Sequence, residues 1–355
     1  MGAPTEVTSG AIVRWCATAT SSLALGEGVL DRLQRTIGFD GAFFATADPA
    51  TLLYTSAVRR DMPADASPAF IRTEFGEHDV NQFRILARAP TPVGDLDAAT
   101  KGDRMSSLRY REAMRPFGLG DELRVALRVD GLCWGLLCLH RLDGVAGFGQ
   151  RDAALLKSVA PHLAEGLRRS VAERRAIEDW TDGGPGVAVL DRDRNVQATT
   201  PAAAMWLEEL AELDVPRAAQ LPTVVRTVIE RLDAGGPRGD TTLLPRVRVR
   251  APSGRWLVIH ASQLDSGRGV AVVIEPATPA VLSSLVIAAY GLTARETDVA
   301  QRLLAGLARK TIASELCISQ YTVNDHVKAV FDKTGVSSAG QLRAQVFADQ
   351  SAPPR

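Results

Sequence analysis

Residues 292–347 constrain the fold most, because their apolar residues recur at helical spacing in short stretches separated by breaks. Gly306 ends the first stretch, and residues 317–319 form a turn before the third, with Ser319 placed as its N-cap. The pattern predicts four short helices. Their core positions are Val299, Leu303, Leu304, Ile312, Ala313, Leu316, Val323, Val327 and Val330 or Phe331.

The third of these helices has a polar outer face opposite its three valines, formed by Tyr321, Asn324, Asp325, Lys328 and Asp332. A helix with such a face, presented by a preceding helix and a tight turn, fits the major groove of DNA. The alternative is that these side chains form an ordinary solvated helix face. We favour the DNA-binding interpretation because four helices occur in register.

The segment resembles the LuxR-type DNA-binding domain over about a sixth of the chain. The resemblance implies that Asn324, Asp325 and Lys328 face base edges, where Asn pairs with adenine and Asp accepts from cytosine. It also implies that Thr322, Lys310 and Lys333 lie near phosphates, with Tyr321 on the same surface. The matching residues are Leu292, Thr293, Arg295, Glu296, Val299, Gly306, Ile312, Ala313, Leu316, Ile318, Ser319, Thr322, Val323, His326, Lys333 and Val336.

Two positions depart from the family pattern. Ala308 stands where a small hydroxyl residue is usual, so the second helix lacks its N-cap, a loss of about 1 kcal/mol. Ala339, followed by Gly340, stands where an Arg is usual, so one phosphate contact is missing. We assign His326 to packing, because a single His without nearby Cys or acidic partners is rarely a metal ligand.

The small net charge of the C-terminal segment predicts that the protein binds DNA as a dimer. The C-terminal segment carries an excess of only two positive charges, so a monomer should bind DNA weakly and in a salt-dependent manner. A symmetric homodimer would place two half-sites about one helical turn apart, or a multiple of it. The whole chain has 41 basic and 41 acidic residues, which argues against binding nucleic acid or membrane by bulk charge.

The remaining chain is long enough for further domains, since 355 residues correspond to two or three. Residues 11–38 predict a helix, residues 41–48 and 51–58 a hairpin, DELRVALRVDGLCWGLLCLHRL a second hairpin, and residues 148–180 a long helix. This order resembles a GAF domain at residues 1–175. The long helix either packs on its own sheet or connects domains or protomers.

A Gly-rich break at residues 182–186 precedes a second α+β region, 183–276. Its expected strands lie at 187–191, 196–199, 245–251, 255–263 and 269–275, with helices at 201–210 and 222–233. Together with VAVLDRDRNVQATTPAAAMWL, this order resembles a PAS domain. A short helix at 280–290 opens the C-terminal domain, 280–350. The fold class is therefore multidomain: GAF-like α+β, PAS-like α+β and an all-α helix-turn-helix domain.

Folds of this kind often enclose a small-molecule cavity, and its candidate lining is aromatic. The alternative for each of these side chains is an ordinary core position. We expect no cofactor and no metal: Cys133 and Cys138 are an odd number of residues apart and should face opposite sides of a strand, and His140 or His260 gives little support for haem. The candidates are Phe43, Phe44, Tyr54, Phe83 and Trp134.

These features predict a transcription regulator with double-stranded DNA and RNA polymerase as partners, governed by an unidentified small-molecule effector or protein partner. The absence of a signal-like N-terminus and of a run of about 20 apolar residues predicts a cytoplasmic protein without membrane contact. One alternative is a sigma-factor region. Another is an enzyme using the closely spaced acids Asp95, Asp97, Asp191 and Asp193, although Asp is common in turns for backbone reasons.

Overall fold

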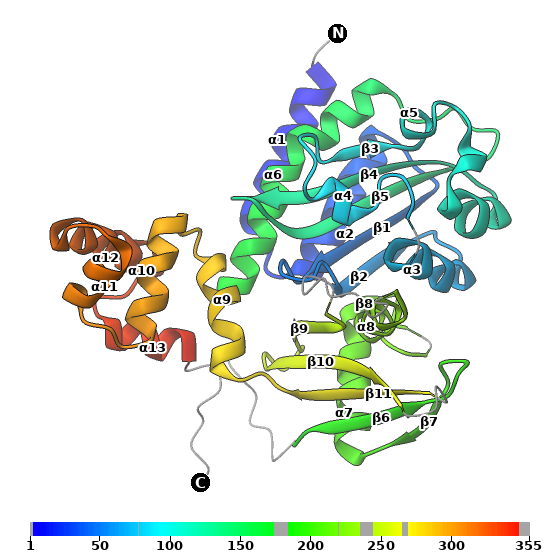
Figure 1. Ribbon diagram of the computed structural model, residues 1–355. Helices are drawn as coiled ribbons and strands as arrows, with labels where there is room; N and C mark the ends of the chain where they lie inside the picture. The colour runs from blue at the N-terminus through cyan, green and yellow to red at the C-terminus, as the bar shows by residue number, and fades with distance from the viewer. Residues whose placement is uncertain are drawn as a thin grey trace. The chain divides into compact units, whose positions relative to one another are not determined.

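The computed structural model describes residues 3–76, 78–173, 184–218, 220–234, 244–264 and 269–347. The chain divides into two compact units (Figure 1). The first comprises Met1–Leu167, Trp180–Pro252 and Leu257–Glu275, and the second comprises Arg168–Asp179, Ser253–Trp256 and Pro276–Arg355.

The N-terminal region forms two helices, α1 (Ala3–Thr18) and α2 (Ser22–Thr36). The prediction of one helix over residues 11–38 is therefore wrong. Ser21 adopts an extended backbone, with φ −154° and ψ 160°, and its hydroxyl accepts a hydrogen bond from the Ala24 N–H at 3.1 Å. Such an N-cap starts a new helix, because it satisfies a backbone donor that has no partner within the helix.

The first sheet has six strands in the order β3-β4-β5-β1-β2-β8. Both predicted hairpins are confirmed, β1 with β2 and β4 with β5. Asp130 and Gly131 connect β4 to β5 with φ of 51° and 77°, the left-handed conformation that a tight hairpin requires. The strands are β1 (Gly41–Ala47), β2 (Tyr54–Arg60), β3 (Val93–Asp95), β4 (Leu119–Val129), β5 (Leu132–Leu142) and β8 (Asp214–Val215).

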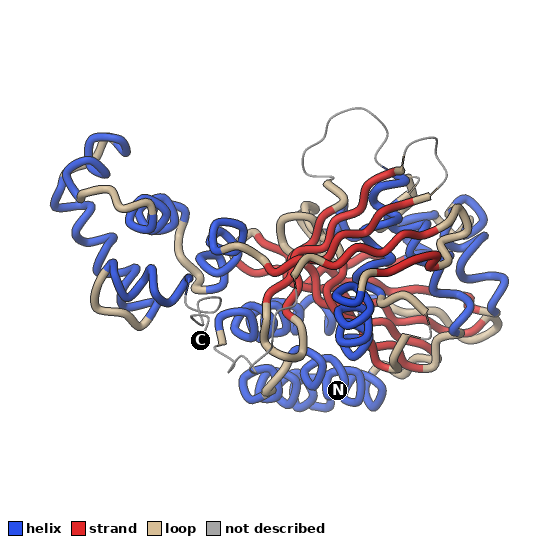
Figure 2. The backbone as a smooth tube through the Cα atoms, turned by 90° about the horizontal axis from the view of Figure 1, so that it is seen from below, coloured by secondary structure: helices blue, strands red, loops and turns tan. Residues whose placement is uncertain are grey.

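Helices flank this sheet (Figure 2). The long helix α6 (Gln150–Ala172) packs on the sheet of its own domain, because a Cβ at Gly135 of β5 would lie 2.4 Å from Leu167 Cδ1. Part of its predicted range, 174–180, lies outside the described residues. The shorter helices are α3 (Ser67–Phe75), α4 (Phe83–Leu86) and α5 (Leu96–Thr100), with helical turns at Ala64–Ala66, Arg104–Ser106, Tyr110–Met114 and Arg115–Phe117.

The second α+β region forms a five-stranded sheet in the order β7-β6-β11-β10-β9, and its predicted element order is confirmed. Thr200 caps the first of its helices by accepting a hydrogen bond from the Ala203 N–H. The elements are β6 (Gly186–Leu190), β7 (Val196–Thr199), α7 (Pro201–Leu210), a helical turn at Ala211–Leu213, α8 (Thr223–Ala234), β9 (Arg246–Arg250), β10 (Trp256–Gln263) and β11 (Val270–Pro276).

The two sheets belong to one unit and share a core. Strand β8 follows α7 in sequence, yet it joins the first sheet in parallel with β2, pairing Ala57 with Asp214. The Asp48 carboxylate, after β1, accepts from Arg248 on β9: Nη2 to Oδ1 is 2.6 Å and Nε to Oδ2 is 2.9 Å. The second region is therefore joined to the GAF-like region by backbone pairing and a buried ion pair.

Strand register corrects the prediction that Cys133 and Cys138 face opposite sides. Leu127 pairs with Gly135, but Arg128 pairs with Cys133, so Trp134 is an extra residue in β5. Such a bulge reverses the alternation of side chains beyond it. Both thiols lie in the same buried cluster.

In the second unit, the four predicted C-terminal helices and the short helix before them are confirmed. They are α9 (Pro279–Ala289), α10 (Ala294–Leu304), α11 (Arg309–Leu316), α12 (Gln320–Thr334) and α13 (Ala339–Phe347). Among the described residues, none of the helices is long and apolar enough to cross a membrane.

Candidate nucleic-acid interface and effector pocket

The helix-turn-helix unit is held by a polar contact between α10 and α12. Thr293 and Glu296 form a capping box at the start of α10. The Glu296 carboxylate also accepts from Lys333 Nζ of α12 at 2.7 Å. Burial raises the pKa of Glu296, but the bonds from Lys333 and Thr293 outweigh it and lower that pKa overall. Lys333 therefore positions α12, and its contact with phosphate stays a prediction.

The turn between α11 and α12 follows from local backbone chemistry. Cys317 ends α11 in the left-handed conformation, with φ 53°. Ser319 caps α12, as predicted, by accepting a hydrogen bond from the Thr322 N–H at 3.0 Å. Ala308 precedes α11 without a side-chain cap, which confirms the predicted absence of an N-cap. The turn thus fixes where α12 begins, whereas the start of α11 lacks that support.

The exposed face of α12 carries the residues that the sequence assigned to base contacts. Asn324, Asp325 and Lys328 are exposed, and Tyr321 is 76% exposed. Lys310 is exposed on α11, and the half-buried Thr322 shares a hydrogen bond with the Ser319 hydroxyl. The opposite face is buried through Val323, Val327 and Val330. The predicted residues thus lie on α12, except for Lys310, which lies on α11.

Sequence reasoning missed Arg309, the first residue of α11. Its Nη1 donates to the Asn324 Oδ1 at 2.9 Å. This bond orients the amide, so that the Nδ2 donors are the end available to another acceptor. The sequence shows Arg309 and Lys310 as adjacent basic residues, but it does not show that Arg309 donates to Asn324.

The first unit contains a pocket, open to solvent, between the first sheet and helices α3 and α8. Phe43 and Tyr54 line it, as predicted, with their ring centroids 5.4 Å apart. The full lining is Phe43, Tyr54, Arg59, Met62, Pro63, Ser67, Phe70, Ile71, Arg124, Cys138, His140 and Thr223.

The other three aromatic candidates do not line this pocket. Phe44 follows Phe43 in a strand, so it faces the opposite side and packs against α2 at Gly26. Phe83 is buried with the Arg124 guanidinium 3.8 Å from its ring centroid. Trp134 is buried at the bulge in β5. The assignment of these residues to the cavity is wrong because composition alone does not show which face of the sheet they occupy.

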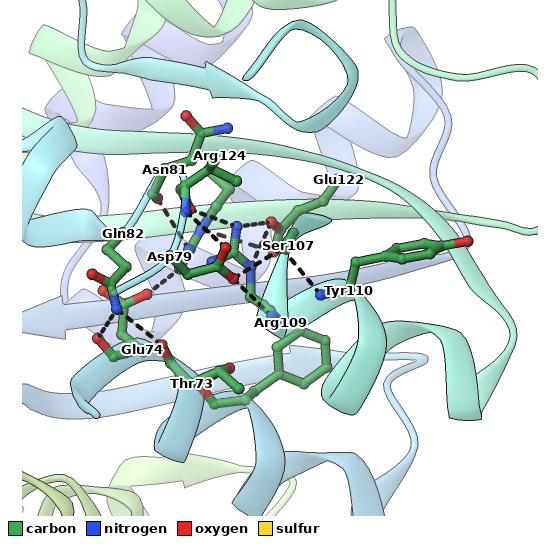
Figure 3. Close-up of polar contacts among 12 residues, drawn as sticks. Thr73, Glu74, Asp79, Asn81, Gln82, Ser107, Arg109, Tyr110, Glu122 and Arg124 are labelled. Atoms are coloured by element: carbon green, nitrogen blue, oxygen red, sulfur yellow. Dashed lines mark hydrogen bonds and ion pairs between the residues drawn. The ribbon is translucent and has the colours of Figure 1, made fainter. Parts of the chain in front are cut away.

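A cluster of buried charges lies beside the pocket, and one of its members, Arg124, lines it; Figure 3 shows the polar contacts of the cluster. Arg109 Nη2 lies 2.7 Å from Glu122 Oε2, and Arg124 Nη2 lies 2.6 Å from Glu74 Oε2. The carboxylate of Asp79 lies 3.6 Å from Arg109. Burial raises the pKa of Glu122, but Arg109 and Arg124 outweigh it and hold that pKa at about 2. One indication was available in the sequence, namely that Glu122 and Arg124 alternate with the apolar Leu123 and Val125 in the middle of this strand.

His140 and Cys138 lie on the neighbouring strand β5, across from two of these charged residues. His140 pairs in register with Glu122, and Cys138 pairs with Arg124. The His140 Nε2 lies 3.9 Å from Glu122 Oε1. Burial lowers the pKa of His140 to about 4, against the opposing effect of Glu122, so the imidazole is neutral near pH 7.

Comparisons with known families match both regions. Residues 291–344 match the model of bacterial regulatory proteins of the luxR family, and residues 23–167 match the GAF domain model. The transcriptional regulatory protein UhpA of Escherichia coli is 43% identical over 56 residues, which are 16% of this chain and 29% of UhpA. The chain therefore spans less than a third of the length of this curated relative.

Solved structures give two further similarities. A GAF domain from a phosphoenolpyruvate-protein phosphotransferase of Coxiella burnetii is 15% identical and covers 47% of this chain and 95% of that one, with a TM-score of 0.35. The Vibrio cholerae VqmA dimer is 17% identical, covering 45% and 80%, with a TM-score of 0.18. The family matches carry the assignment: this chain contains a GAF domain and a LuxR-type helix-turn-helix domain.

Proposed function

We propose that this chain is a sequence-specific DNA-binding transcription regulator whose helix α12 enters the major groove. The observation that carries the proposal is the exposed polar face of Asn324, Asp325 and Lys328, on a helix whose start is capped and whose other face is buried. The match of residues 291–344 to luxR-family regulators supports it. RNA polymerase is the functional partner that such a regulator requires.

We further propose that the regulator acts as a homodimer. The free positive charge of the domain is small, because Lys333 is bound to Glu296 and Arg302 to Glu315. Two domains on two half-sites would double the number of phosphate contacts and hence increase affinity.

The GAF domain, together with the PAS-like second region, is the proposed sensor for a small molecule or protein partner. A pocket with apolar walls and a few buried polar groups in its lining suits a ligand that has an apolar body and one polar group. Binding changes DNA affinity only if the ligand prefers one arrangement of the domains over another. We propose that α6 and α9 couple the sensor to the DNA-binding dimer.

Three of the four acids of the enzyme alternative, Asp95, Asp97 and Asp191, have local structural roles. Asp95 caps α5 by accepting from the Ala98 N–H at 2.7 Å, and Asp97 binds Arg104 through two bonds of 2.5 and 2.7 Å. Asp191 accepts from the Asn195 N–H at 2.9 Å in the turn before β7. These contacts favour a regulator over an enzyme.

The test is DNA binding by the purified full chain without RNA polymerase, first by selection from random duplexes and then by footprinting. We expect a defined site, and we expect Lys310→Ala to weaken binding to all sequences about equally. Lys157→Ala, which removes the same charge from an exposed position on α6, is the matched control and should bind as the parent does. An absolute requirement for core polymerase would support the sigma-factor alternative instead.

A further inference from the structure

Three side chains with metal-binding atoms meet beside the pocket, and two of them, Cys138 and His140, line it. Glu122 of β4 and His140 of β5 are paired in register, and Cys138 lies two residues before His140 on the same face. One carboxylate oxygen, one thiol sulfur and one imidazole nitrogen all lie within 4.8 Å of one another. Each residue is at most 4% exposed. The neighbouring strands thus bring oxygen, sulfur and nitrogen donors to one buried point.

A second observation concerns polar atoms at this point. Among the described residues, neither Glu122 Oε1 nor His140 Nδ1 has a hydrogen-bond partner, although both atoms are fully buried. Arg124 Nε lies 3.8 Å and His140 Nε2 3.9 Å from Glu122 Oε1, both beyond hydrogen-bonding distance. Burying a polar atom without a partner costs free energy, so each such atom calls for an explanation. A bound ion supplies one for Glu122 Oε1, and for His140 Nδ1 where that nitrogen is the ring atom that binds the ion.

The charges of the cluster favour a cation. Its buried acids are Glu74, Asp79 and Glu122, and its buried bases are Arg109 and Arg124, which leaves one excess negative charge. Arg59 also lines the pocket, but its guanidinium donates to the carbonyl oxygen of Pro216. A divalent metal bound to the Cys138 thiolate brings two positive charges and one further negative charge, so the cluster becomes neutral.

We propose that Glu122, Cys138 and His140 bind one divalent transition metal ion, of the class of zinc or ferrous iron, with an open coordination position facing the pocket. Cys138 and His140 line that pocket. Mixed sulfur, nitrogen and oxygen donors suit these metals and not calcium or magnesium. On binding, the thiol S–H bond breaks, a metal–sulfur bond forms, and the proton passes to the solvent. The metal would be the polar group that an effector contacts, so the inference rests on the proposed sensor function.

The three ligand atoms have to move closer together to bind one metal ion. Metal–ligand bonds of about 2.0 to 2.3 Å in a tetrahedral site place ligand atoms roughly 3.3 to 3.8 Å apart. The ligand atoms lie within 4.8 Å of one another, so the longest separation between them has to shorten by about 1 Å. No strand has to move, because all three residues already share one face of β4 and β5. The sequence alone predicted no metal, since it placed Cys138 and Cys133 by simple alternation and did not include the bulge at Trp134.

The test uses the full chain, reduced, stripped of metal with a chelator and titrated anaerobically with cobalt(II) as a spectroscopic probe. We expect one equivalent to bind and to give a thiolate-to-cobalt charge-transfer band. Cys138→Ala should abolish that band, and His140→Ala should weaken binding at least about tenfold. Cys133→Ala is the matched control, because Cys133 lies on the same strand and in the same buried cluster. It should bind cobalt as the parent does.

Folding is checked in each variant by circular dichroism and by thermal unfolding with and without zinc. Zinc should raise the Tm of the parent and of Cys133→Ala but not that of Cys138→Ala. The proposal is overturned if cobalt gives no charge-transfer band, or if Cys138→Ala retains it. DNA binding measured in parallel separates the two claims: if the parent binds no cobalt but still footprints its site, the metal site is refuted and the regulator is not.

Discussion

The ion pair between Asp48 and Arg248 joins the two sheets of the first unit, in addition to the backbone pairing of β8 with β2 and the shared core. Three donors of Arg248 reach the Asp48 carboxylate: its backbone N–H at 3.0 Å, Nε at 2.9 Å and Nη2 at 2.6 Å. The side chains are 2% and 10% exposed, so water competes little for these bonds. Asp48 also accepts from the Ala50 N–H, which shapes the connection between β1 and β2.

Asp48→Ala leaves a largely buried guanidinium without this carboxylate. Breaking a buried pair by removing one partner costs about 3 to 5 kcal/mol. A domain typically unfolds with a free energy of about 5 to 15 kcal/mol, so this loss is a large fraction of the total. The double variant Asp48→Ala/Arg248→Met should recover most of it, because the guanidinium that loses this carboxylate is then removed as well.

The assay is denaturant unfolding combined with hydrogen exchange of the full chain. In Asp48→Ala, protection should fall in both sheets together, in peptides from β1 and β2 and in peptides from β9. The control is Glu208→Gln, which removes an exposed partner of Arg217 and should cost under about 1 kcal/mol. The shared-core description is refuted if Asp48→Ala costs no more than this control, or if protection falls in only one sheet.

Two further predictions concern the helix-turn-helix unit. Ala308→Ser should supply the missing N-cap of α11 and raise the unfolding free energy of this domain by about 1 kcal/mol, measured by thermal denaturation, and no gain would contradict the capping argument. Lys333→Met should lower stability near pH 7 by under about 1 kcal/mol, because the pair is partly exposed. The folded-state pKa of Glu296 is lowered, so its contribution is present above the unfolded-state pKa and is lost as pH falls through the folded-state value. The variant should therefore show a smaller loss of stability between neutral and acidic pH than the parent, and an identical pH profile would exclude the pair.

Local patterns in the sequence were enough to predict the DNA-binding unit. The spacing of Val323 and Val327 fixes the buried face of α12, and Ser319 marks its start, because both effects act within a few residues. The hairpin turn at Asp130 and Gly131 was predictable for the same reason. One local feature was overlooked, namely that Ser21 caps a new helix within the range predicted as one.

Contacts between distant parts of the chain were not predictable. Asp48 and Arg248 are 200 residues apart, and no periodicity links them. The strand β8 leaves the second region to pair with β2, so the sequence suggested two bodies where there is one compact unit. The pocket was predicted from its aromatic residues, but the cluster beside it depends on charges that pair over long distances in the sequence, such as Arg124 with Glu74. A single bulge at Trp134 was sufficient to reverse the expected placement of Cys133.

The central claim is that α12 reads bases in the major groove, and the most direct measurement is the base preference of Asn324→Ala against that of the parent on the selected site. Removing an amide that pairs with one base should cost about 1 to 3 kcal/mol on the preferred sequence and relax preference at that position alone. Arg309→Ala, which frees the Asn324 amide, should broaden preference at the same position. If Asn324→Ala bound the selected site and random DNA as the parent does, the assigned face of α12 would be wrong.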